Sequence, residues 1–265
     1  HNLVRWRGRR LFSQDPLDAA LYRPTGGCWD RWLDPRLSSW LADEGRGETP
    51  GEGGEGRIPD FVEELIPGVY ALDLFSTEFC RSLVSEVERC QLLAKERGIP
   101  ISRPNSMNRG GAVLSELGLE PLMDSLQDRV LSPLASRLFP LAGSELTSHH
   151  SFVVEYRPDR DVALDMHTDD SDVTFNVCLG KGPFVGSGLS FCGVLGRPNH
   201  RAESLRYAHR ARRCVVHLGL RRHGADDIRS GERVNLVVWN RNRAWRRSSH
   251  HLGPLHQVAY EREGG

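Results

Sequence analysis

The segment HTDDSDVTFNVCL, residues 167–179, places a His-x-Asp pair directly before a short run of β-branched and aromatic residues. Similar runs occur through the C-terminal half: SFVVEY at 151–156, GLSFCGV at 188–194, RCVVHLG at 213–219 and RVNLVVW at 233–239. Clusters of Gly, Pro, Asn and Asp separate them, as expected for strands joined by turns. Several short strands spaced in this way are typical of a sandwich or barrel, so we predict a β core in this half.

The residues before this region predict helices that support the core. Ser76 is a good N-cap, and residues 77–96 carry apolar side chains at helical spacing. A second helix is expected near 119–139, interrupted around Pro133, and residues 69–74 alternate like a strand. The predicted class is therefore α+β, with the helices first and the β core second.

We divide the chain of 265 residues into three parts. Residues 1–44 carry four tryptophans among charged residues and are expected to form short helices that pack onto the main domain. Residues 45–58, GRGETPGEGGEGRI, cannot bury apolar area and predict a linker or loop. Residues 59–265 form the expected main domain. The chain begins with His1 instead of Met, as expected for part of a longer protein.

A metal site is predicted from residues on either side of the central strands. His167 and Asp169 are two positions apart, so in extended backbone both side chains point to the same side. Such a pair alone is weak evidence, but His223 lies ten residues before Arg233, at the start of a later strand. Two His and one carboxylate leave coordination positions open, as Fe(II) oxygenases require. His217 is a rival for the third ligand.

Arg233 strengthens this interpretation. An arginine that faces a barrel interior is costly to bury without an anion. A dicarboxylate cosubstrate would supply that anion through a bidentate pair. The competing interpretation is structural: His223 caps a turn and Arg233 pairs with a nearby acid.

The segment from about 69 to 239 resembles the prolyl/lysyl hydroxylase branch of the 2-oxoglutarate and iron-dependent dioxygenases. Within that branch it is most similar to a group of oxygenase-domain-containing proteins with plant and algal members. The stretches that carry the resemblance are RPNSMNRGGAVL (103–114), SHHSFVVEY (148–156), HTDDSDVTFNVCLGK (167–181) and RHGADDIRSGERVNLVVW (222–239). The resemblance implies a double-stranded β-helix, the jelly-roll core of cupin-like proteins.

The resemblance also implies a complete set of binding residues. These are His167, Asp169 and His223 for Fe(II), and Arg233, Tyr156 and Asn176 for 2-oxoglutarate. Arg233 would bind the 5-carboxylate, and its spacing fits His223 better than His217. O2 is the second cosubstrate that the resemblance implies, with ascorbate as an accessory reductant.

The expected reaction is hydroxylation of a C–H bond on a Lys or Pro side chain of a protein or peptide, with CO2 and succinate as co-products. The arginine-rich insert at 197–213 is expected to line the active-site mouth, where it would suit an acidic peptide or a nucleic acid strand. Hydroxylation or demethylation of a nucleic acid is therefore an alternative, as is a non-catalytic metal-binding interaction module. Residues 103–111 form a second expected entrance segment.

Composition sets broader limits. The chain is 38% hydrophobic and 26% charged with zero formal net charge, ordinary values for a soluble globular protein. It has no run of 18 uncharged apolar residues, so we expect no membrane association. The six cysteines form no CxxC pair. We expect reduced, mostly buried thiols and an intracellular location, in the cytoplasm or nucleus.

Overall fold

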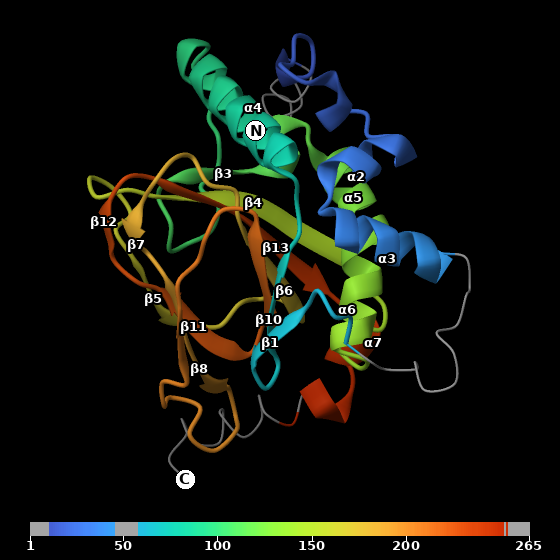
Figure 1. Cartoon of the computed structure of the whole chain (residues 1–265). Helices are drawn as coiled ribbons and strands as arrows, with labels where there is room; N and C mark the ends of the chain where they lie inside the picture. Colours follow the sequence, from blue (N-terminus) through green and yellow to red (C-terminus); the bar gives the residue numbers. More distant parts are fainter. Residues whose placement is uncertain (1–10, 46–57, 252, 254–265) are drawn as a thin grey trace.

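The computed structural model describes residues 11–45, 58–251 and 253, and builds them around two antiparallel sheets (Figure 1). The strands are β1 (Glu63–Ile66), β2 (Val69–Asp73), β3 (Gly111–Val113), β4 (Ser148–Tyr156), β5 (Leu164–His167), β6 (Val173–Cys178), β7 (Val185–Gly186), β8 (Leu189–Val194), β9 (Leu205–Tyr207), β10 (Arg213–Leu218), β11 (Arg221–Ala225), β12 (Ile228–Ser230) and β13 (Arg233–Arg241). The helices are α2 (Gly26–Trp32), α3 (Pro35–Gly45), α4 (Thr77–Glu96), α5 (Glu120–Leu126), α6 (Ser132–Leu138) and α7 (Arg243–Arg246). Short helical turns are η1 (Ala19–Leu21), η2 (Leu114–Leu117) and η3 (Gln127–Leu131).

The strand order identifies the predicted double-stranded β-helix. The larger sheet runs β1-β2-β10-β6-β13-β4-β3, and the smaller one runs β5-β11-β8-β9. From β4 to β13, the chain crosses repeatedly between the two sheets, so strands adjacent in sequence rarely pair with each other. This winding forms a jelly roll, which confirms the predicted fold class.

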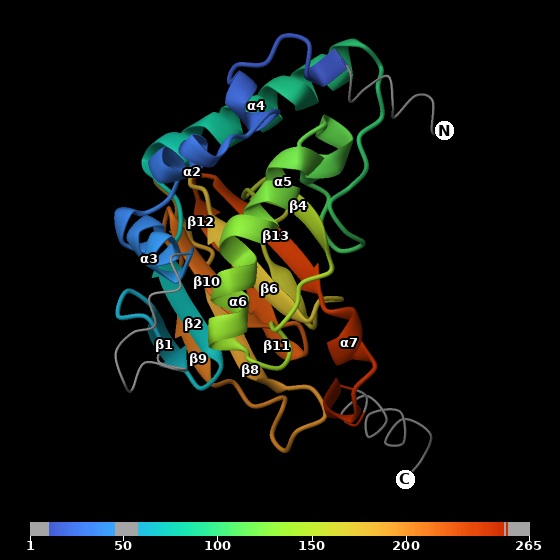
Figure 2. The same cartoon turned by 90° about the vertical axis from the view of Figure 1, so that its right-hand side faces the viewer.

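Two apolar layers follow from the alternation of side chains along the larger sheet. Val153, Phe175 and Leu236 point to one face and join the core that includes α4, α5 and α6. Phe152 and Val237 point to the other face and pack against the smaller sheet. Figure 2 shows α5 and α6 lying across the outer face of the larger sheet. Phe152 and Val237 also line a small cavity between the sheets.

The described N-terminal residues are part of this core. Trp29 and Trp32 of α2 are buried, and their ring centroids lie 6.3 Å and 5.3 Å from that of Phe79 in α4. Leu33 forms a β-bridge with Phe75, just before α4 begins. Within residues 11–45 the structure therefore has short helices packed against α4. Residues 46–57 of the expected linker lie outside the described residues.

The supporting helices agree with the sequence in detail. Ser76 caps α4, because its side chain accepts a hydrogen bond from the backbone nitrogen of Phe79 at 3.2 Å. The expected interruption near Pro133 is real: a π-helical turn joins α5 to α6, and Pro133 lies in the first turn of α6.

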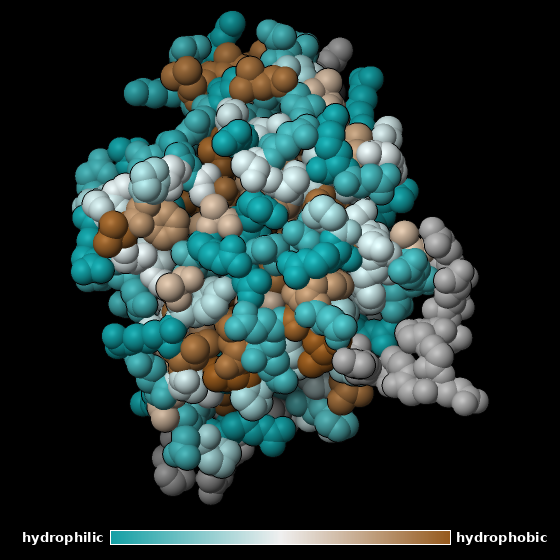
Figure 3. Space-filling view, in the orientation of Figure 1, coloured by the Kyte–Doolittle hydropathy of each residue, from teal (hydrophilic) through white to brown (hydrophobic). Residues whose placement is uncertain are grey.

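The cysteines are mostly buried, as expected. All six cysteines are free, and five are buried. Among the described residues, no helix is long and apolar enough to cross a membrane. Figure 3 shows one face of the molecule, on which apolar side chains are interspersed with polar ones.

Candidate metal and cosubstrate site

Three side chains with metal-binding atoms meet between the two sheets. His167, Asp169 and His223 each offer one such atom, and these atoms lie within 4.8 Å of one another. Nε2 of His167 is 3.3 Å from Oδ1 of Asp169, and Nε2 of His223 is 3.5 Å from Oδ2 of Asp169. Two imidazoles and one carboxylate around a common point are suited to a divalent iron with open positions.

Strand pairing brings these residues together. His167 ends β5 and stands directly opposite His223 in β11. Asp169 follows in the connection to β6, where its backbone nitrogen donates to the carbonyl of Gly219 at 2.9 Å. Thr174 Oγ1 donates to Oδ2 of Asp169 at 2.7 Å and so orients the carboxylate.

Backbone carbonyls place a proton on Nδ1 of both imidazoles. Nδ1 of His167 lies 2.7 Å from the carbonyl oxygen of Asp165, and Nδ1 of His223 lies 3.0 Å from that of Arg221. A carbonyl only accepts, so each Nδ1 carries a proton and Nε2 is the ring atom left to bind a metal. A bound metal needs this tautomer.

Burial and charge act against each other within the trio. Burial opposes ionisation of Asp169, but His223 and His167 outweigh it and hold the pKa of Asp169 well below its usual range. Burial lowers the pKa of His223. In His167, burial is outweighed by the hydrogen bond to Asp169, which raises its pKa. A carboxylate beside a neutral His223 is the donor set that a cation requires.

His217 lies close to the trio but outside it. Its ring centroid is 4.3 Å from that of His223, and its Nδ1 lies 2.9 Å from the carbonyl oxygen of Leu218. Its Nε2 is buried without a hydrogen-bond partner, and burial lowers the pKa of His217 to about 3. The structure groups His223, and not His217, with His167 and Asp169.

Arg233 is fully buried at the start of β13. Its Nη1 donates to the carbonyl of Ser187, and its Cζ lies 4.5 Å above the ring of Tyr156. Its Nε and Nη2 have no hydrogen-bond partner. A buried guanidinium with two unpaired nitrogens has donors for an anion, and no acid among the described residues forms a salt bridge with it. Those donors fit one carboxylate of a dicarboxylate.

A small cavity connects these groups. Tyr156 and Asn176 line it together with all three members of the metal trio. Tyr156 stands opposite Arg233 in the β4–β13 ladder, and burial raises its pKa. Asn176 Oδ1 accepts a hydrogen bond from Asn235 Nδ2. All six predicted binding residues therefore lie in or beside one cavity.

Some cavity residues were not predicted individually. Asn105 and Asn108 line it from the 103–111 segment, which the sequence predicted only as an entrance. Trp239 also lines it, and its indole nitrogen is buried without a partner. Alternation along β13 places Trp239 on the same face as Arg233, a signal that could have found it.

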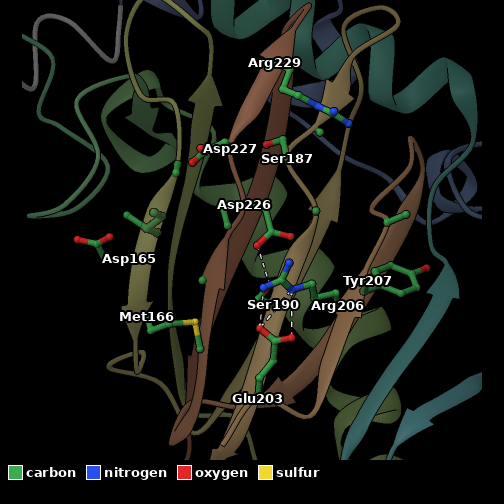
Figure 4. A pocket seen from close by; sticks show the side chains of 17 residues that line it. Asp165, Met166, Ser187, Ser190, Glu203, Arg206, Tyr207, Asp226, Asp227 and Arg229 are labelled. Atoms are coloured by element: carbon green, nitrogen blue, oxygen red, sulfur yellow. Dashed lines mark hydrogen bonds and ion pairs between the residues drawn. The ribbon is translucent and has the colours of Figure 1, made fainter. Parts of the chain in front are cut away.

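The arginine-rich insert at 197–213 lines a different pocket from the cavity that holds the trio. None of its residues lines the cavity that holds the trio. Glu203, Arg206 and Tyr207 instead line a groove on the smaller sheet, which they share with Asp226 and other carboxylates. Figure 4 shows the Arg206 guanidinium between the carboxylates of Glu203 and Asp226. The sequence missed this because the sheet pairing of β8 with β9 decides where the insert goes.

Several arginines of the insert are paired with acids. Arg210 lies 3.5 Å from Asp73, Arg212 lies 3.3 Å from Asp34, and Arg213 contacts Glu63. Guanidiniums neutralised by neighbouring carboxylates attract phosphates weakly. These contacts give no support to the nucleic acid alternative.

Comparison with known proteins places the chain in a family. A family model described as an OGFOD2-like domain matches residues 37–144. The chain is 42% identical over 182 residues to 2-oxoglutarate and iron-dependent oxygenase domain-containing protein 2 of Homo sapiens, covering 68% of this chain and 51% of that protein. It is 39% identical over 197 residues to the oxygenase domain-containing protein ICU11 of Arabidopsis thaliana, covering 71% and 49%. The chain is an OGFOD2-like relative of the 2-oxoglutarate and iron-dependent oxygenases.

More distant similarities agree with this assignment. The chain is 31% identical over 135 residues to the human multifunctional procollagen lysine hydroxylase and glycosyltransferase LH3, covering 49% of this chain but 18% of that protein. The crystal structure of AviO1 from Streptomyces viridochromogenes Tue57 matches with a TM-score of 0.52 and 16% identity, covering 67% of this chain and 91% of that one. This second likeness concerns the fold alone.

These matches confirm the predicted resemblance and support an oxygenase. The resemblance extends further than the sequence analysis placed it. The OGFOD2-like match begins at residue 37, before the Gly- and Glu-rich segment, whereas the resemblance was expected to begin at about residue 69. The chain spans about half the length of the curated relatives it matches. The roles of individual residues and the activity are therefore argued from the site itself.

Proposed function

We propose that this chain is a dioxygenase that uses Fe(II) and 2-oxoglutarate to hydroxylate a C–H bond. The observation that carries the proposal is the joint placement of the metal trio and Arg233. The trio offers two imidazoles and a carboxylate, and Arg233 is buried with two unused donors, as an anion site requires. A non-catalytic metal-binding module would have no need for the costly buried arginine.

The residues have distinct tasks in this reaction. His167, Asp169 and His223 would hold Fe(II), which supplies O2 activation coupled to decarboxylation of 2-oxoglutarate. The balance is substrate C–H, 2-oxoglutarate and O2 converted to substrate C–OH, succinate and CO2. Arg233 would hold the 5-carboxylate, with Tyr156 and Asn176 beside it, and the small size of the cavity limits the access of water.

We propose a Lys or Pro side chain of a protein or peptide as the substrate. A relative of this chain is named a procollagen lysine hydroxylase, which favours a polypeptide over a nucleic acid. At the iron end of the cavity, Trp239 packs edge-on against Phe152, with 5.0 Å between ring centroids, and His150 lies beside both. Aromatic walls of this kind suit an aliphatic side chain.

The proposal is tested first by spectroscopy. Without O2, Fe(II) and 2-oxoglutarate should together give a visible charge-transfer band, and admission of O2 should yield succinate, with ascorbate present as reductant. His223→Ala should abolish the band, whereas His217→Ala, a change of the same kind next to it, should retain it. Absence of both band and succinate in the unchanged protein would overturn the proposal.

The substrate is tested separately. A peptide library with Lys and Pro at varied positions is incubated with the active protein and examined for the mass gain of one oxygen atom, with oligonucleotides in parallel. Oxidation of peptides alone is expected. Oxidation confined to oligonucleotides would replace the protein substrate with a nucleic acid one.

A further inference from the structure

The loop before β3 presents an unused donor to the cavity. Asn108 is 1% exposed, lines the cavity, and its Nδ2 has no hydrogen-bond partner of good geometry. A buried amide nitrogen without a partner costs free energy unless something else accepts its hydrogen bond. A hydrogen-bond acceptor bound inside the cavity would therefore stabilise Asn108 in this position.

The loop holds Asn108 in place through its own hydrogen bonds. Asn105 Nδ2 donates to Oδ1 of Asn108 at 3.0 Å, so the amide has a fixed orientation and its nitrogen is not used by Asn105. Asn105 Oδ1 accepts from the backbone nitrogens of Met107 and Asn108 at 2.9 Å and 2.8 Å. This is an Asx-type turn, which needs no neighbouring element to form.

The far side of the loop is anchored to the β core. Asp161 Oδ2 accepts from the backbone nitrogens of Arg109 and Gly110 at 2.6 Å and 2.9 Å. Gly111 has φ of +123°, and a Cβ there would lie 2.0 Å from the carbonyl oxygen of Val153. The chain can approach β4 this closely only with glycine at that position. Asn108 is thus held at a defined place.

That place is beside the proposed anion site. Burial raises the pKa of Tyr156, and a side-chain hydrogen bond with Asn108 counters that rise, so the two side chains are neighbours. The ring of Tyr156 lies under the Arg233 guanidinium. A carboxylate has about four lone-pair positions, and burying it demands donors for each of them. Arg233 offers two unused donors, and Tyr156 and Asn108 can offer one each.

We propose that Asn108 donates a hydrogen bond to the far carboxylate of the cosubstrate and so helps to select a five-carbon dicarboxylate. This inference rests on the proposed function. An amide suits the task because Arg233 already balances the carboxylate charge, and a neutral donor adds a hydrogen bond without a second buried cation.

The test compares cosubstrates with and without the far carboxylate. Anaerobic Fe(II) protein is titrated with 2-oxoglutarate and with 2-oxobutyrate, and the charge-transfer band gives a Kd for each. Asn108→Asp keeps the shape but replaces the donor with a negative acceptor; Asn108→Ala removes the donor and serves if the Asp variant fails to fold. Asn199→Asp, on an exposed turn, is the matched control.

The expected result is selective. Asn108→Ala should raise the Kd for 2-oxoglutarate about 10-fold and Asn108→Asp about 100-fold, as for loss of a charge-assisted hydrogen bond. The Kd for 2-oxobutyrate should change less than about 3-fold. Equal weakening of both ligands, or of neither, would overturn the inference. Absence of a band in the unchanged protein with either ligand would instead overturn the proposed function, and this inference with it.

Discussion

At the scale of single residues, the site depends on neighbours that fix its ligands. Thr174 is fully buried in β6, and its hydroxyl links Ser171 at 2.6 Å to Asp169 at 2.7 Å. Carbonyl oxygens do the same for the two histidines. Such partners hold ligand atoms toward the metal before it arrives, so their loss lowers metal affinity although they never touch the metal.

Thr174→Val should lower metal affinity by about 10- to 100-fold, because Val keeps the shape but loses the donor to Asp169. Titration with Mn(II), which is stable in air, measures the change. Thr174→Ser keeps the hydroxyl and should bind nearly as tightly as the unchanged protein. Equal affinity of the Val variant would show that Asp169 needs no such support.

At the scale of elements, α4 joins the N-terminal residues to the β core. Glu86 is fully buried in α4, where it accepts from Tyr22 Oη at 2.8 Å and from the backbone nitrogen of Leu17 at 2.9 Å. Arg89, one turn further along α4, forks onto the same carboxylate and also donates to the carbonyl of Phe12. The N-terminal segment is thus attached through a satisfied polar cluster as well as through tryptophans.

Glu86→Gln should lower the free energy of unfolding by about 1–3 kcal/mol, since it removes acceptors from a buried cluster. Hydrogen exchange should rise in residues 17–33. The matched control is Glu88→Gln on the same helix: Glu88 is 44% exposed and bonds Lys181 at 2.6 Å, so its loss should cost about 0–1 kcal/mol. Equal effects of the two changes would contradict the attachment described above.

At the scale of the whole molecule, buried neutral histidines couple folding to pH. Burial, and then the charge of Arg233, lower the pKa of His209 to about 3. His209 bridges the carbonyl of Arg213 at 2.9 Å and the side chain of Asn235. In the unfolded chain the same imidazole titrates near pH 6.5, so acid adds a proton to the unfolded chain first. Stability from His209 is present above about pH 6.5 and is lost as the pH falls toward 3.

The unfolding free energy should therefore decrease between about pH 6 and pH 4. His209→Gln should flatten this decrease by up to about 1.4 kcal/mol per pH unit, the value for one proton. Urea unfolding at a series of pH values measures it. His200→Gln, in a surface turn, is the control, and an equal flattening there would argue against His209 as the source.

Alternation along the strands was enough to predict the β core and the class of fold, because it fixes which side chains share a face. The six candidate binding residues came as a set from the resemblance to the oxygenases. The sequence favoured His223 over His217 only through the spacing to Arg233, since both histidines face the space between the sheets and their distances to Asp169 depend on how the sheets pack. Only the three-dimensional structure shows that residues of 197–213 line a separate pocket and that Asn108 lines the cavity. Loops carry no periodic signal, so their positions follow from long-range contacts such as Asp161 with the backbone of residues 109–110.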